Sequence, residues 1–102
     1  MSLYDTQSLH DFLLHTPESG LRKMLVDRNK VTDVHLNLLV KIVRSCSEAQ
    51  FTEHFDKQDF PKIRLGPAEL KIKEKFWADC MALLLERGIL QPLAAGSQKL
   101  AA

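Results

Sequence analysis

Hydrophobic residues recur at intervals of three and four positions along most of the chain, a spacing that places side chains on one face of an α-helix. We find no run of alternating polar and apolar residues between turn residues, so no strand is expected. The pattern predicts an all-α fold of about five helices of unequal length. Because no heptad is sustained over several turns, the expected architecture is an irregular bundle or a fragment of a helical solenoid.

Local signals mark where each helix should begin. Ser47 and Gln50 have the spacing of a capping box, in which each side chain satisfies a free backbone amide of the other residue. A proline suits the first helical position, because its missing amide would have no partner there. The expected helix starts are Asp5 or Thr6, Thr16 as N-cap followed by Pro17, Thr32, Ser47, and Gly66 followed by Pro67. Gly88 and Pro92 should stop the last helix near Arg87.

Two of these helices are apolar over more than half of their circumference. The helix from Thr32 to about Cys46 leaves only a narrow polar strip, so it is expected to be the buried central helix. The longest helix, from Pro67 to about Arg87, is also broadly apolar. Such a helix packs on both sides, or packs on one side and leaves a face for a partner. Both interpretations stay open at this point.

Length and composition fit one ordinary domain. The chain has 102 residues, of which 45% are hydrophobic and 26% are charged, and its net charge is +1. We expect a single helical domain over residues 1–95. Residues 96–102 end in Lys-Leu-Ala-Ala and resemble a translated vector linker, so they are left out of the fold prediction. The near-zero charge offers no global field to attract nucleic acid or an acidic membrane.

The sequence predicts neither a membrane span nor secretion. No apolar run approaches the roughly 20 residues that a span needs, and the N-terminus lacks the basic and apolar regions of a signal peptide. The two cysteines, Cys46 and Cys80, fall in apolar helical stripes and do not form a disulfide framework. The expected compartment is intracellular, either cytoplasmic or nuclear.

Catalytic and metal-binding patterns are not apparent in the sequence. The four histidines and two cysteines lack the paired short spacings of zinc sites. The carboxylates are scattered, and several fall in first turns of helices, where they complement the helix dipole. The chain has neither a Walker loop nor a dinucleotide-binding glycine motif nor a nucleophile elbow. We therefore expect a non-enzymatic protein without cofactor or metal.

The leading interpretation is a protein–protein interaction module, part of a larger intracellular protein. An apolar loop runs into the broadly apolar last helix, and together they could frame a groove for a helix or peptide of a partner protein. The other interpretation of this loop is that it simply folds over the core. The candidate partner-binding residues are Phe55, Phe60, Ile63, Phe76 and Trp77.

The alternative is a helical nucleic-acid-binding domain that uses the basic cluster of residues 57–75. Its cations lie close in sequence to aromatic residues that could stack on bases. Interleaved acidic residues favour instead an ordinary solvated face, and Phe76 and Trp77 are more typical of a core than of a stacking platform. The candidate contacts are Lys62, Arg64, Lys71, Lys73 and Lys75, with Lys57 at the edge of the cluster.

One stretch of the chain resembles a known family. The sequence Gly20-Leu21-Arg22-Lys23-Met24-Leu25, a polar connection, and the apolar helix from Val34 to Cys46 resemble the armadillo-like helical region of large X-box-binding-type zinc-finger RNA helicases. The resemblance implies a non-catalytic helical segment of an RNA-associated protein. Helicase motifs and cysteine-rich fingers are not present in this sequence, so no functional residue is carried over.

Overall fold

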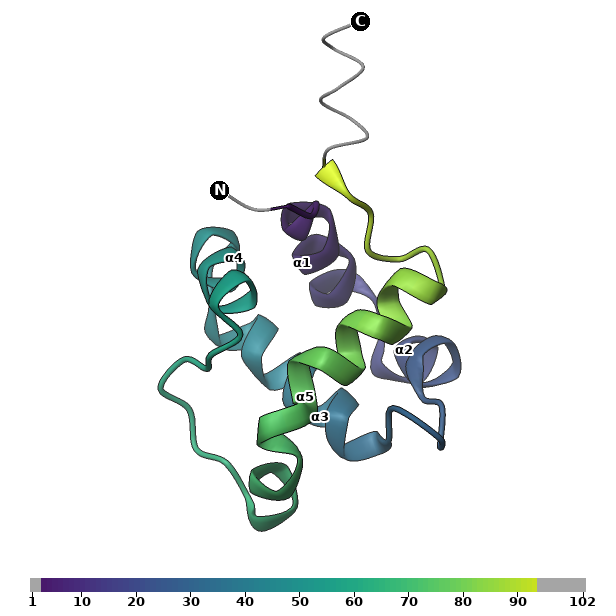
Figure 1. Ribbon diagram of the computed structural model, residues 1–102, viewed down its shortest axis with the longest axis vertical. Helices are drawn as coiled ribbons and strands as arrows, with labels where there is room; N and C mark the ends of the chain where they lie inside the picture. The colour runs from purple at the N-terminus through teal and green to yellow at the C-terminus, as the bar shows by residue number, and fades with distance from the viewer. Residues whose placement is uncertain (1–2, 94–102) are drawn as a thin grey trace, which may run out of the picture.

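The helix at the centre of the molecule, α3, is contacted by three of the other helices. The structure is a computed structural model that describes residues 3–93, and in this range it forms an irregular all-α bundle, as the sequence predicted (Figure 1). α5 crosses over α3, α2 packs at one end of α3, and α1 packs between α3 and α4. The elements are α1 (Thr6–His15), α2 (Glu18–Leu25), α3 (Asp33–Ser45), α4 (Glu48–Lys57) and α5 (Pro67–Glu86).

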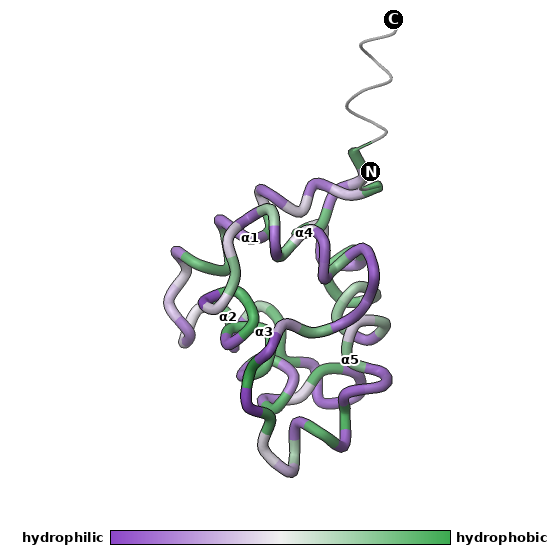
Figure 2. The backbone as a smooth tube through the Cα atoms, turned by 90° about the vertical axis from the view of Figure 1, so that its left-hand side faces the viewer, coloured by the Kyte–Doolittle hydropathy of each residue, from purple (hydrophilic) through white to green (hydrophobic). Residues whose placement is uncertain are grey.

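The burial of α3 confirms the prediction of a central helix. Seven of its residues are buried, whereas Asn37, Lys41 and Arg44 form the expected polar strip. Figure 2 shows how hydrophobic and hydrophilic residues alternate along the turns of the helices. The buried apolar residues of all five helices belong to one continuous core, because each helix turns its apolar stripe toward α3 or a neighbour of α3.

Most of the predicted helix ends are confirmed. The Asp5 side chain accepts a hydrogen bond from the Ser8 amide, and Ser47 and Gln50 form the expected capping box. Pro67 opens α5, and Gly88, with a φ of 73°, follows its end. A residue with a side chain would be strained in that left-handed conformation, so glycine is the suitable stop signal.

Thr16 acts differently from the prediction. Its hydroxyl donates a 2.6 Å hydrogen bond to the Phe12 carbonyl, so it closes the C-terminal end of α1. Pro17 has an extended backbone and takes the N-cap position of α2, whereas the sequence predicted it at the first helical position. The hydroxyl cannot serve both helices, and the free carbonyl of α1 is the partner that it reaches.

The described ends of the chain pair with each other. The Asp5 amide donates a 2.8 Å hydrogen bond to the Gln91 carbonyl, and the Leu93 amide donates one of 3.0 Å to the Leu3 carbonyl. This short antiparallel contact holds the segment after α5 against the start of α1. The predicted vector-derived tail, residues 96–102, lies outside the described residues. Between residues 3 and 93, no helix is long and apolar enough to cross a membrane.

Candidate partner-binding surface

Three of the five predicted partner-binding residues lie in the core. Phe55, Phe76 and Trp77 are 2%, 0% and 3% exposed, and the Trp77 ring packs edge-on against the rings of Phe55, Phe76 and Phe51. A partner cannot reach side chains that are this deeply buried. The expectation that these three residues face a partner therefore has to be corrected, because their rings are needed to join α4 to α5.

Phe60 and Ile63, the other two, are half-buried in the loop that connects α4 to α5. Phe60 packs against both Phe76 and Trp77, with ring centroids 5.6 and 6.0 Å apart. The loop therefore does cover part of the core, as one of the two interpretations of the sequence held. Its apolar side chains are nevertheless only partly covered, so they still present a surface to solvent.

The connecting loop, residues 58–66, is fixed to the helices at both of its ends. Near its start, the Asp59 carbonyl accepts a 2.9 Å hydrogen bond from the Trp77 indole nitrogen, and the Asp59 carboxylate pairs with His54. Near its end, the Arg64 carbonyl accepts a 3.0 Å hydrogen bond from the Lys41 ammonium. These bonds hold the loop in one place without a helix or strand of its own, as a preformed binding surface requires.

Lys41 also forms the ion pair that anchors the beginning of α5. Its ammonium lies 2.7 Å from the carboxylate of Glu69, which also accepts a hydrogen bond from the Gly66 amide. Burial opposes ionisation of Glu69, but the bonds from Lys41 and Gly66 outweigh it and hold the pKa of this carboxyl below its ordinary value. The charged form of Glu69 therefore stabilises the junction between the loop and α5.

Two open hollows are lined in part by the loop. One, of about 600 Å³, is lined by Gln58, Asp59, Phe60, Pro61, Ile63, Leu65, Lys73 and Glu74. The other, of about 640 Å³, shares Ile63 and Leu65 and is bordered by Lys41 and Glu69. Leu70, which is 55% exposed, precedes Lys73 and Glu74 by one turn on the same face of α5. We call residues 58–66 together with Leu70, Lys73 and Glu74 the loop surface.

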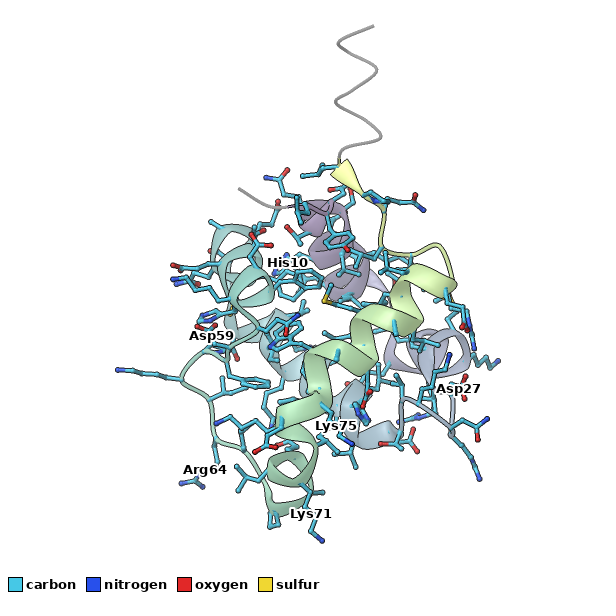
Figure 3. The ribbon with its side chains drawn as sticks, in the orientation of Figure 1. His10, Asp27, Asp59, Arg64, Lys71 and Lys75 are labelled. Atoms are coloured by element: carbon cyan, nitrogen blue, oxygen red, sulfur yellow. The ribbon has the colours of Figure 1, made fainter. Side chains whose placement is uncertain are left out.

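The predicted basic cluster contains cations without ion-pair partners. None of its five candidate contacts forms an ion pair with any residue in the part of the chain that the structure describes, whereas Lys57 at its edge pairs with Glu53. Figure 3 shows Arg64 and Lys71 pointing away from the body of the molecule at the same end. The five unpaired cations are Lys62, Arg64, Lys71, Lys73 and Lys75.

These five cations do not form one patch. Lys62 and Arg64 are exposed on the loop, and the Lys73 ammonium lies 5.6 Å from the centre of the Phe60 ring, over the first hollow. Lys71 and Lys75 lie one turn apart on the opposite, solvent-facing side of α5, as the 100° step between residues requires. The structure therefore assigns three of the cations to the loop surface.

A short alternation within the loop was missed by the sequence prediction. From Lys62 to Leu65, basic and apolar residues alternate, and the structure exposes Lys62 and Arg64 while Ile63 and Leu65 are half-buried. The segment is bounded by Pro61 and Gly66, which are turn residues. That boundary, together with the alternation, was the signal that could have identified which side chains of the segment face solvent and which face the core.

Other groups that could carry chemistry have structural partners. The buried His10 ring lies 3.0 Å from the Cys46 carbonyl and so satisfies the end of α3. The buried His35 lies between Thr32 and Asp79, to both of which it is hydrogen-bonded, which joins α3 to α5. Among the described residues, no three histidine, cysteine or acidic side chains are grouped so that they could hold a metal ion.

Comparisons of the chain with protein-family models, curated proteins and solved structures found no match. The resemblance to the armadillo-like helicase region thus stays a prediction.

Proposed function

We propose that this chain is a non-enzymatic interaction module that binds a segment of a partner protein on the loop surface. The observation that carries the proposal is that the loop exposes Lys62 and Arg64, and that Lys73 lines the first hollow together with half-buried apolar side chains; none of these three cations has an ion-pair partner among the described residues. The two free cysteines favour a reducing compartment, so we place the module in the cytoplasm or nucleus.

The apolar side chains would supply most of the affinity. Phe60, Ile63 and Leu65 are already partly ordered against the core, so a partner that covers them gains burial at a small cost in side-chain entropy. Leu70, exposed one turn before Lys73 on α5, offers further apolar area. The unpaired cations would select a partner that carries carboxylates and would speed its association.

A nucleic-acid partner is the second candidate, because unpaired cations also suit phosphates. Two features of the loop surface weaken it. The rings of Phe76 and Trp77 are buried, so they cannot stack on bases, and the Phe60 ring is approached by Lys73. A protein segment is therefore favoured.

The proposal is tested by affinity capture from a nuclease-treated cell extract, with the chain as bait. The informative variant is Lys62→Glu with Arg64→Glu. Its matched control is Lys23→Glu with Arg28→Glu, which reverses two exposed cations that also lack ion pairs within residues 3–93. We expect one protein to be retained by the wild-type chain and the control, and to be lost from the loop variant.

Two results would count against the proposal. Equal retention of the protein by both variants would place its binding site elsewhere on the chain. Recovery of nucleic acid alone, lost when the salt concentration is raised moderately, would favour the second candidate, because phosphate contacts weaken steeply with salt.

A further inference from the structure

We infer that a second copy of this chain also binds on the loop surface, in a two-fold symmetric dimer that is centred on Leu70, Lys73 and Glu74. The inference rests on the proposed function, because it names one occupant of the same surface. A two-fold dimer brings the same patch of both copies together, so the patch has to be complementary to itself. The loop surface meets this requirement in both charge and shape.

The charges at the centre of the patch are opposite and unpaired. Lys73 and Glu74 both line the first hollow, and neither forms an ion pair with any residue in the part of the chain that the structure describes. Adjacent residues of a helix project about 100° apart, so the ammonium and the carboxylate do not face each other within one copy. A two-fold axis that passes between them places Lys73 of each copy opposite Glu74 of the other. The dimer therefore gains two ion pairs that one copy cannot form.

The shape of the patch is also complementary to itself, because an exposed leucine lies near a hollow. Leu70 is 55% exposed, one turn before Lys73 on the same face of α5. The axis between Lys73 and Glu74 makes the two copies of α5 antiparallel. Leu70 of one copy then lies opposite Trp77 of the other, since the first precedes Lys73 by three residues and the second follows Glu74 by three. Phe60, whose ring lies 6.0 Å from that of Trp77, lines the hollow at this point, so each Leu70 meets the Phe60 of the other copy.

The mixed charge of the hollow suits an occupant that also carries both signs. Its lining includes the carboxylates of Asp59 and Glu74 and the ammonium of Lys73. The first half of α5 from a second copy presents Lys73, Glu74 and the apolar Leu70 together, which matches this lining. Each copy has a net charge of only +1, so the two copies repel each other weakly as they approach.

Burial of apolar side chains supplies the affinity of the dimer. The hollow of about 600 Å³ is half-lined by apolar residues and has room for a leucine side chain. Symmetry makes every contact occur twice. One turn of a helix and a short loop form a small interface, so the Kd of the dimer should lie between micromolar and millimolar. A partner segment that binds in the hollow has to compete with the second copy, and self-association thereby regulates access to the loop surface.

The test is sedimentation equilibrium of the purified chain over a concentration series that spans this range. Lys73→Glu and Glu74→Lys should each raise the Kd of the dimer by at least about tenfold, because each places like charges opposite one another. In an equimolar mixture of the two variants, the carboxylates of one copy face the ammonium groups of the other. The mixture should therefore form a mixed dimer with a Kd within about threefold of the wild-type value.

A pair of leucine variants locates the interface. Leu70→Ser should raise the Kd by about tenfold or more, because it removes the side chain that enters the hollow. The matched control is Leu14→Ser, which changes a leucine that is 43% exposed on α1, outside the loop surface, and it should leave the Kd unchanged. Circular dichroism of each variant shows that a loss of the dimer does not come from unfolding.

The dimer and the proposed function can fail separately. A wild-type chain that stays monomeric throughout the series overturns the dimer, whereas affinity capture with Lys62→Glu and Arg64→Glu still tests the binding of another protein. A dimer that survives Leu70→Ser, or a mixture that does not recover the wild-type Kd, overturns the placement of the interface on this patch. A dimer that behaves as expected, with a capture that retains no other protein, upholds the inference and overturns the proposed function.

Discussion

The indole nitrogen of Trp77 donates a 2.9 Å hydrogen bond to the backbone carbonyl of Asp59. This bond joins the middle of α5 to the beginning of the connecting loop. Its acceptor, Asp59, immediately precedes Phe60 in the sequence. Because the Trp77 ring is buried, the bond is shielded from water and the loop is held at a fixed distance from the helix. The position of the loop surface depends on this contact.

Replacing Trp77 by phenylalanine tests that dependence. Trp77→Phe keeps most of the buried ring but leaves the Asp59 carbonyl without its donor, so the free energy of unfolding should fall by about 1–3 kcal/mol. Urea denaturation followed by circular dichroism measures the loss, since the variant has no tryptophan left for fluorescence. Amide hydrogen exchange should also become faster in residues 59–65. Unchanged exchange in the loop would show that the bond does not position it.

The Glu69–Lys41 pair predicts a pH dependence of stability. The pKa of Glu69 is lowered in the folded chain, so its charged form is favoured by folding. Its contribution is complete above the ordinary glutamate pKa of about 4.3 and is lost as the pH falls through the lower folded-state value. Glu69→Gln should lower the free energy of unfolding at neutral pH by about 1 kcal/mol and flatten the acid slope.

Glu74→Gln is the matched control for this measurement, because Glu74 is exposed on the same helix and forms no ion pair with other described residues. Urea denaturation over a pH series compares the two variants. The same acid slope in Glu69→Gln and in the wild-type chain would contradict the assignment to Glu69.

The hydroxyls of Thr6 and Thr52 should be coupled. They are 2.6 Å apart, and Thr6 is only 3% exposed, so this bond links α1 to α4 inside the protein. Thr52→Val alone leaves a buried hydroxyl without that partner and should cost about 1–3 kcal/mol. The double variant Thr6→Val, Thr52→Val should recover much of the loss. A double-mutant cycle in urea measures the coupling, and strictly additive effects would refute it.

The two thiols should react in a fixed order. Burial raises the pKa of both, and Cys80, which is 3% exposed and lies next to Asp79, is affected much more than the half-buried Cys46. A thiol reagent at about pH 8 should therefore modify Cys46 first and Cys80 only as the chain unfolds. Mass spectrometry of timed samples gives the order, and Cys46→Ser isolates Cys80. Rapid modification of Cys80 in native Cys46→Ser would contradict its burial.

The helix starts could be predicted from the sequence because their signals are local. Asp5, Thr32 and Ser47 each cap their own helix within its first turn, so the few residues that follow each of them suffice to identify the cap. Thr16 shows the limit of this reasoning. Its hydroxyl had two helix ends within reach, and the sequence does not say which of them it satisfies.

The candidate site was only partly predictable because burial is a property of the whole fold. Phe60 and Phe76 are both aromatic residues near basic ones, but the packing of α5 on α3 and α4 buries Phe76 fully and leaves Phe60 half-covered. Likewise, the absence of an ion pair at Lys62 and the presence of one at Lys57 depend on where distant or neighbouring carboxylates fall. These outcomes require the tertiary structure.

The most direct test of the account is to map where an acidic peptide contacts the chain. The nitrogen-labelled chain is titrated with a short peptide of alternating valine and glutamate residues, and amide chemical shifts are followed by NMR. The account predicts that the largest shifts fall on residues 60–65 and on Lys73 and Glu74, and that Lys62→Glu with Arg64→Glu abolishes them. Shifts centred elsewhere, such as on the hollow formed by Leu3, Tyr4 and Met81, would contradict the claim that the loop surface is the binding site.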